Sequence, residues 1–285
     1  MITELQTWAI FFLPLASFVL IALAIRPFLG SRSRLSGYLT ILAIGLAFLL
    51  SLFALRSTLG HQEAIGWPSH EWLTIGGLEI RLGVLLDPLT AIMLVVVTGV
   101  SLLVQVYSQG YMRDDESYTR YFAYMSLFTA SMVGIVLARS IIQMYVFWEL
   151  VGLSSYLLIG FWYQRPAAAA AAKKAFLITR IGDVGFLLAI LYLFVQRDNF
   201  AAQGLNPFEI PDILKAAGVG AMTTFAVTLT SLGIFAGAVG KSGQFPLHTW
   251  LPDAMEGPTP VSSLIHAATM VAAGVFLAAR FFPLF

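Results

Sequence analysis

The chain has 285 residues, of which 59% are hydrophobic and 11% charged, and its formal net charge is +1. Soluble domains of this length carry far more charge, so the composition predicts a polytopic membrane protein. The absence of cysteine excludes disulfides, thiolate-held iron–sulfur clusters and cysteine nucleophiles, and the near-neutral charge argues against nucleic acid as a partner.

Eight apolar runs are long enough to span a membrane, which predicts an all-α protein with eight transmembrane helices. They cover residues 5–26, 37–59, 86–107, 120–138, 140–163, 174–196, 222–254 and 260–280. The first run lacks a basic n-region and a cleavage site, so we expect it to remain as a membrane anchor. The alanines at 167–172 are expected to begin the sixth helix, because alanine is the best helix former.

Two connections are long. Between the second and third runs, apolar and polar residues alternate from Glu71 to Arg81 around Gly76-Gly77, which predicts a small surface β-hairpin. The connection at 197–221 contains a segment at 206–215 that is typical of a short amphipathic surface helix. If the helices alternate in direction, both connections lie on the same side of the membrane.

The seventh run is too long for one straight helix, since about 33 residues would extend roughly 50 Å against a hydrocarbon core of about 30 Å. Gly240, Gly243 and Pro246 predict a break there. Lys241 lies in this break, and a broken helix at membrane depth requires protein or water around its freed backbone groups. The alternative is that Lys241 marks a helix end and extends to the interface. His248 continues the face of Lys241 only if the break preserves the helical phase.

Other ionisable residues lie within the neighbouring apolar runs. Glu149 falls near the middle of the fifth run, on a face of small and tyrosine side chains, where it either serves in transport or only joins helices. Arg180 and Asp183 share one face of the sixth predicted helix, and Lys174 lies a turn and a half earlier. The alternative to a role in transport is that Arg180 and Asp183 form a local ion pair that only stabilises the fold. His266 lies inside the eighth, where a lone histidine is otherwise a satisfied core residue.

Glu149, Asp183, Lys241 and His266 thus occupy four successive predicted helices. Each would cost roughly 2.5–3.5 kcal/mol at the bilayer centre, so pairing or hydration must offset the cost. These groups exchange protons when burial shifts their pKa values, which favours a proton path. With Glu149 about 6 Å from Lys241, an effective dielectric of about 20 gives an attraction of roughly 2.8 kcal/mol. Moving or neutralising the carboxylate would then release the proton of the lysine.

Three stretches closely resemble the largest antiporter-like subunit of respiratory complex I, the proton-translocating NADH-quinone oxidoreductase. They are residues 144–161 (MYVFWELVGLSSYLLIGF), residues 179–185 (TRIGDVG) and residues 240–271. The resemblance implies five-helix repeats of inverted topology, each with a broken helix. Residues 1–115 would form the N-terminal three helices with the hairpin, and residues 116–285 the first antiporter-like repeat, containing the fourth to eighth helices.

The resemblance also implies roles. Glu149 would modulate the lysine, Lys241 would carry the proton in the broken helix, and His266 would lead toward the central hydrophilic axis. Arg180 and Asp183 match charged positions of the family, and Lys174 and His248 complete the candidate residues. No cofactor is expected in this chain, because NADH, flavin, iron–sulfur clusters and quinone belong to other subunits of such a complex.

The implied partners are lipids and other membrane-arm subunits of complex I, especially the neighbouring antiporter-like subunit. The implied location is an energy-transducing membrane, foremost the bacterial plasma membrane, with an organellar inner membrane or a thylakoid as alternatives.

The length departs from the family, whose members are about twice as long and carry a second repeat and a lateral helix. We therefore expect a fragment or a split gene that is active only in an assembled or full-length context. One competing interpretation is a subunit of a multisubunit sodium/proton antiporter, or of a related hydrogenase or carbon-uptake complex. Residues 253–260 (DAMEGPTP) favour complex I. Another is a non-catalytic membrane scaffold or an inactive fragment, in which the charges only hold helices together.

Overall fold

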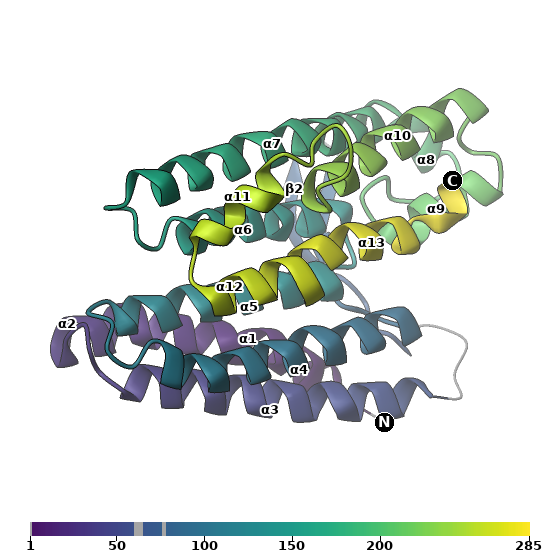
Figure 1. Cartoon of the computed structure of the whole chain (residues 1–285). Helices are drawn as coiled ribbons and strands as arrows, with labels where there is room; N and C mark the ends of the chain where they lie inside the picture. The colour runs from purple at the N-terminus through teal and green to yellow at the C-terminus, as the bar shows by residue number, and fades with distance from the viewer. Residues whose placement is uncertain (1, 60–64, 76–77) are drawn as a thin grey trace.

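The computed structural model describes residues 2–59, 65–75 and 78–285, and this part of the chain contains eight helices long and apolar enough to cross a membrane. The predicted all-α membrane fold is confirmed (Figure 1). Six spans are single α-helices: α3 (Leu35–Thr58), α4 (Pro88–Tyr111), α5 (Tyr118–Leu137), α6 (Ile141–Ile159), α7 (Pro166–Val195) and α10 (Thr224–Lys241).

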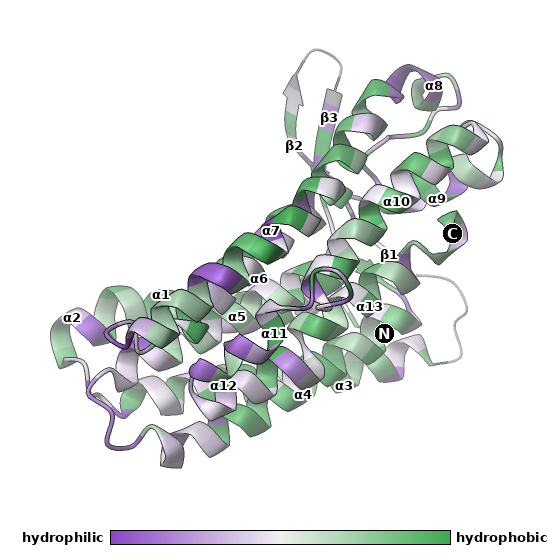
Figure 2. Ribbon diagram, turned by 45° about the horizontal axis from the view of Figure 1, so that its top comes forward, coloured by the Kyte–Doolittle hydropathy of each residue, from purple (hydrophilic) through white to green (hydrophobic). Residues whose placement is uncertain are grey.

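Two further spans contain a π-helical turn. The first joins α1 (Glu4–Leu20), the π-helix η1 (Ile21–Ile25) and α2 (Arg26–Leu29), and the last joins α12 (Thr259–Ser263), the π-helix η3 (Leu264–Ala268) and α13 (Met270–Arg280). Hydrophobic residues dominate the spans, and hydrophilic residues gather at connections such as the one that follows α2 (Figure 2).

The α5 helix is the centre of the bundle, because nearly all of its residues are buried. It packs against α1, α3 and α4 on one side and against α6 on the other. Beyond α6 lie α7 and α10, which pack along each other, and α13 packs against α10 (Figure 1). The first three spans thus lie on one side of α5 and α6 and the pair α7 and α10 on the other, whereas the last span also packs against α4 and α5.

The two long connections meet on one side of the bundle. Strands β2 (His70–Ile75) and β3 (Leu78–Leu82) pair antiparallel with Ile75 opposite Leu78, and β1 (Ile65–Gly66) pairs with β4 (Leu85–Leu86). The predicted hairpin strands are confirmed, whereas the predicted Gly76-Gly77 turn lies outside the described residues. In the second connection, α8 (Arg197–Ala201) is followed by α9 (Ile210–Gly218), which confirms the expected amphipathic helix.

Arg139, in the turn between α5 and α6, ties these connections together. Its Nε donates to Glu209 Oε2 at 2.8 Å, and its Nη1 donates to the Trp67 carbonyl at 3.2 Å. Burial raises the pKa of Glu209 above its ordinary value, and the hydrogen bond and charge of Arg139 only partly oppose this. The expectation that both long connections share one side is therefore confirmed.

The α7 helix begins at Pro166 and includes the alanine run. It starts eight residues earlier than the apolar run at 174–196, because alanine and lysine favour the helix without being strongly apolar. At 1.5 Å per residue its 30 residues extend about 45 Å, longer than a hydrocarbon core of about 30 Å. It is therefore long enough to span the hydrocarbon core with residues to spare.

The predicted break of the seventh span is confirmed. The α10 helix ends at Lys241, Gly243 adopts a positive φ of 59°, and helical structure resumes only in α11 (Trp250–Asp253) and the 3-10 turn η2 (Ala254–Glu256). A second 3-10 turn, η4 (Phe282–Leu284), ends the chain. The eight non-helical residues between α10 and α11 separate the two parts, so the break does not preserve the helical phase.

Candidate functional site

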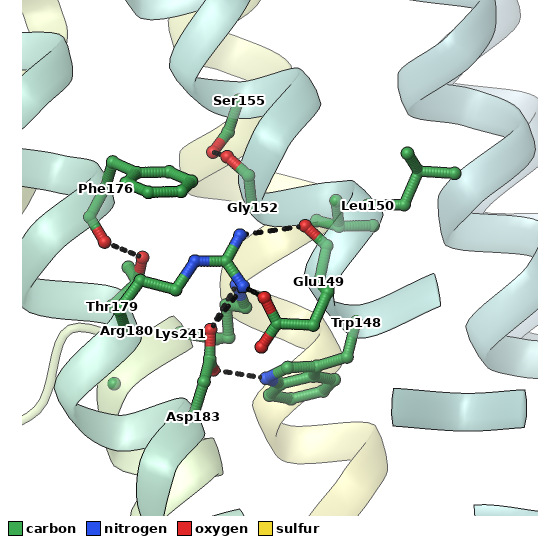
Figure 3. Close-up of polar contacts among 12 residues, drawn as sticks. Trp148, Glu149, Leu150, Gly152, Ser155, Phe176, Thr179, Arg180, Asp183 and Lys241 are labelled. Carbon is green, nitrogen blue, oxygen red and sulfur yellow. Dashed lines mark hydrogen bonds and ion pairs between the residues drawn. The ribbon is translucent and has the colours of Figure 1, made fainter. Parts of the chain in front are cut away.

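A buried ion pair lies at the break of the seventh span. Lys241, the last residue of α10, has a fully buried side chain, and its Nζ lies 3.2 Å from Oδ2 of Asp183, which is 1% exposed. Trp148 Nε1 donates to the other oxygen, Oδ1, at 2.6 Å (Figure 3). The lysine Nζ also lies 5.8 Å from the Trp148 ring centroid. Both carboxylate oxygens are thus satisfied, as a buried charge requires.

A second ion pair lies beside the first. Arg180 Nη1 pairs with Glu149 Oε2, and Nη2 of the same guanidinium donates to the Glu149 carbonyl at 3.0 Å. Nη1 also lies 3.5 Å from Asp183 Oδ2, so Arg180 connects the two carboxylates (Figure 3). The result is a continuous row of charges from Glu149 on α6 through Arg180 and Asp183 on α7 to Lys241 on α10.

The charge row is accessible from outside the protein only at the end formed by Glu149 and Arg180. The side chains of Glu149 and Arg180 are 30% and 21% exposed, whereas Asp183 and Lys241 are enclosed. Glu149 Oε1 is buried and has no hydrogen-bond partner among the described residues. Phe176 covers the guanidinium of Arg180 from one face, with 4.4 Å between its ring centroid and the central carbon.

The structure adds a closer partner to the attraction between Glu149 and Lys241 that the sequence suggests. Lys241 pairs with Asp183, and Glu149 pairs with Arg180. The local pair between Arg180 and Asp183, proposed as the structural alternative, is present. It links the two pairs, so Arg180 and Asp183 connect Glu149 to the lysine.

Glycines make room for this row. A Cβ on Gly152 of α6 would lie 2.7 Å from Lys241 Nζ and 2.9 Å from Arg180 Nη2, closer than real Cβ contacts. A Cβ on Gly182 would lie 2.9 Å from the Cα of Gly240, which shows how closely α7 approaches α10. The small residues therefore let two cations and two helix backbones meet inside the bundle.

The remaining candidate residues lie outside the row. His266 is on the π-helix η3, with 6.5 Å between its ring centroid and that of Trp250, and its buried Nε2 has no partner among the described residues. Lys174 pairs with Asp253 at 2.7 Å, both being more than 40% exposed. His248 is exposed on the loop after α10, because that loop does not continue the helix.

Two features were missed in the sequence. Trp148 directly precedes Glu149, and adjacent helical residues point about 100° apart, so nothing linked it to Asp183. Arg280 of α13 pairs with Asp87, the N-cap of α4, and donates to Thr90 Oγ1 at 2.5 Å. Although burial of Asp87 raises its pKa, the hydrogen bonds and charge of Arg280 outweigh this and hold it below its ordinary value.

Metal binding receives no support from the described residues, which contain no cluster of three histidine or acidic side chains suited to a metal ion.

Two family models match the chain. Residues 138–285, more than half of it, match the model described as NADH:quinone oxidoreductase/Mrp antiporter, TM. Residues 72–122 match the model described as NADH-Ubiquinone oxidoreductase (complex I), chain 5 N-terminus. The first match covers the whole charge row from Glu149 to Lys241.

Curated relatives cover almost all of this chain. The chloroplastic NAD(P)H-quinone oxidoreductase subunit 5 of Mesostigma viride is 47% identical over 281 residues, which are 98% of this chain and 42% of that protein. The protein of the same name from Marchantia polymorpha is 47% identical over 289 residues, covering 98% and 40%. The chain thus spans about two fifths of the length of these relatives.

Solved structures share the fold. The Mrp complex from Dietzia sp. matches at 30% identity with a TM-score of 0.77, over 97% of this chain and 28% of that one. The archaeal membrane-bound sulfane sulfur reductase matches at 21% identity with a TM-score of 0.77, over 99% and 54%, and supports the fold alone. With more than half of its residues matched by the family model, the chain belongs to the NADH:quinone oxidoreductase/Mrp antiporter transmembrane family.

Proposed function

We propose that this chain is a proton-translocating membrane subunit of a complex I type NAD(P)H-quinone oxidoreductase. The observation that carries the proposal is the fully buried lysine at a broken transmembrane helix, paired with Asp183 and connected to a partly exposed carboxylate. An ionisable group at this depth marks an ion or proton pathway by default. The curated relatives, named as subunits of such oxidoreductases, support the same function.

The geometry supports a switch in which two cations compete for one oxygen. Asp183 Oδ2 lies 3.2 Å from Lys241 Nζ and 3.5 Å from Arg180 Nη1. With an effective dielectric of about 20, these attractions are roughly 5.2 and 4.7 kcal/mol, so they nearly balance. While Glu149 is ionised it holds Arg180, and Asp183 stabilises the ammonium of Lys241.

Protonation or displacement of Glu149 would shift the balance. Arg180 would then turn to Asp183, whose hold on Lys241 would weaken, and the buried ammonium would lose its proton. Glu149 lies at the exposed end of the charge row, so a proton or a conformational change from outside this chain would act on the row there.

We assign His266 as the next proton carrier beyond Lys241. The non-helical segment after α10 leaves backbone groups that need water or protein partners, which favours local hydration on the way to η3. The buried Nε2 of His266, unpartnered among the described residues, suits a bound water. Lys174 and His248 are assigned to the surface end of the path, because both are accessible there.

We further propose that a neighbouring membrane subunit covers the open side of Glu149 and Arg180. A charged group facing lipid at this depth would cost roughly 2.5–3.5 kcal/mol, so protein contacts there are favoured. Such a neighbour would be another antiporter-like subunit, and NAD(P)H, flavin, iron–sulfur clusters and quinone would belong to further partners. Residues 116–285 would form one antiporter-like repeat, which the family match at 138–285 supports.

The membrane would be an energy-transducing one, either the bacterial plasma membrane or an organellar membrane, as in the relatives that are named chloroplastic.

A second candidate is a subunit of a multisubunit sodium/proton antiporter, favoured by the fold match to the Mrp complex at 30% identity. The curated oxidoreductase subunits are more similar, at 47%, and support the first candidate.

Inverted membrane vesicles carrying the assembled protein distinguish the two candidates. We expect oxidation of the electron donor to acidify the vesicle interior, and a quinone-site inhibitor to abolish the signal. Acidification that follows an imposed sodium gradient instead, with no response to the electron donor, would favour the antiporter. A lack of both responses in fully assembled protein would favour the scaffold.

A further inference from the structure

A basic pocket lies between the ends of three helices, away from the charge row. Arg120, Tyr124, Tyr156, Tyr163 and Lys173 contribute its polar groups, and its volume is about 190 Å³. It lies where α5 begins, α6 ends and α7 begins. Its lining contains two cations and three phenols and no carboxylate.

The two cations have no acidic partner among the described residues. Arg120 donates from Nη2 to the Phe161 carbonyl at 3.1 Å, and its guanidinium lies over the rings of Phe161 and Tyr163 at 4.7 and 5.2 Å. Its Nε is buried without a hydrogen-bond partner in the described part of the chain. Lys173 is exposed and forms no ion pair there. The pocket therefore has unmatched positive charge and unused donors.

An apolar groove continues from this pocket along α6 and α7. It is lined by Leu153, Phe176 and Leu177 together with Tyr156 and Lys173, which also line the basic pocket. Leu177 is 64% exposed, so the groove opens toward the hydrocarbon. A cationic pocket joined to an exposed apolar groove matches a molecule with an anionic head and a hydrocarbon tail.

The depth of the pocket agrees with such a ligand. Because α7 is about 15 Å longer than the hydrocarbon core, each end extends about 7 Å beyond it if the excess is shared. Lys173 is seven residues from the start of α7, or about 10 Å, which places its side chain within reach of the headgroup layer. Basic pockets at this level, between transmembrane helices, favour anionic lipid headgroups.

We propose that this chain binds an anionic phospholipid here. The phosphate contacts Arg120 and Lys173 and accepts hydrogen bonds from the tyrosines, and one acyl chain fills the groove along Leu153, Phe176 and Leu177. The bound lipid lies on the α6–α7 face at Phe176, which adjoins Arg180, and therefore at the edge of the contact proposed for the neighbouring subunit.

Native mass spectrometry of the detergent-purified protein tests this, with phosphatidylglycerol compared with phosphatidylcholine of the same chains. Each basic residue near the surface contributes about 1 kcal/mol, so we expect the Arg120→Gln/Lys173→Gln double variant to bind phosphatidylglycerol about 30-fold more weakly. Lys173→Gln alone, at an exposed position that leaves folding intact, should weaken it about 5-fold. Phosphatidylcholine, whose choline cation offsets the phosphate charge, should bind more weakly at the start and lose less affinity in both variants.

Two controls sharpen the result. Arg165→Gln removes a cation that stacks on Trp162 and does not line the pocket, so it should leave phosphatidylglycerol binding unchanged. Leu177→Gln should weaken binding through the acyl chain alone. The proposal is overturned if Lys173→Gln binds phosphatidylglycerol like the unsubstituted protein, if both lipids respond equally, or if inorganic phosphate displaces the lipid at equal concentration.

Discussion

Replacing Asp183 by asparagine tests how much the buried lysine depends on its carboxylate. Asparagine keeps nearly the same volume and an oxygen that accepts from Trp148 Nε1, as Asp183 Oδ1 does at 2.6 Å. The change therefore removes one charge 3.2 Å from Lys241 Nζ and replaces the acceptor that faces the lysine with an amide NH2 group, which cannot accept a hydrogen bond. With an effective dielectric of about 20, the lost attraction is roughly 5 kcal/mol.

This loss is large enough to stop proton loading. Five kcal/mol corresponds to more than a thousandfold change in the ratio of protonated to neutral Lys241, and Arg180 remains nearby to repel the ammonium. We expect proton uptake by inverted vesicles, measured by quenching of a pH-sensitive fluorophore and normalised to assembled complex, to fall at least tenfold. Asp198→Asn is the matched control, because that side chain is 87% exposed. Unchanged uptake in Asp183→Asn at equal assembly would refute the assigned pairing.

Three further predictions concern other parts of the structure. Gly152→Ala places a methyl group 2.7 Å from the buried ammonium of Lys241, about 0.7 Å closer than ordinary contact, so proton uptake should slow. Gly110→Ala is the control, because a Cβ there meets nothing within 4 Å, and its proton uptake should stay normal. Equal uptake rates in the two variants would contradict the close packing at Gly152. Asp87→Asn leaves the guanidinium of Arg280, which is 5% exposed, without its carboxylate partner. The substitution should lower the free energy of unfolding by about 3 kcal/mol, measured by thermal unfolding. An unchanged melting temperature would show that the ion pair contributes nothing to stability. The folded state raises the pKa of Glu209 above 4.5, so the folded protein binds this proton more tightly than the unfolded chain does. The stability that this proton contributes is lost as the pH rises from about 4.5 through the raised pKa. A plot of melting temperature against pH should lack this decrease in Glu209→Gln, and identical plots for the variant and the unsubstituted protein would contradict the assignment.

Much of the fold follows from local patterns in the sequence. The lengths of the apolar runs predict eight spans, and two glycines beside Lys241 predict where the seventh helix ends. Alternating residues around the Gly76-Gly77 pair predict the hairpin strands. Each of these features depends on neighbouring residues, which is why composition and periodicity were sufficient.

The pairing within the charge row could not be predicted in the same way. Asp183 and Lys241 are 58 residues apart, and which carboxylate meets the lysine depends on how α6, α7 and α10 rotate against one another. Gly152 and Gly182 allow the close approach that brings Asp183 to the lysine and leaves Glu149 to Arg180. The relative rotation of three packed helices cannot be inferred from the periodicity of one sequence.

The π-helical turn at His266 and the exposure of His248 are also outcomes of tertiary packing. Sequence spacing assumes an unbroken α-helix around His266, whereas the π-helical turn changes the helical phase at this residue. The eight residues after Lys241 could continue the helix or leave it, and only the structure shows that His248 leaves the face of the lysine.

Proton uptake with Lys241→Met tests the central claim most directly. Methionine retains much of the length of the lysine and removes its charge, so the fully buried position remains filled. Lys215→Met, at an exposed position on α9, is the matched control. We predict that vesicles with Lys241→Met take up no protons during oxidation of the electron donor, although the complex assembles and the control takes up protons normally. Proton uptake per electron equal to that of the unsubstituted protein would contradict the account, because no path through the broken helix would then use this lysine.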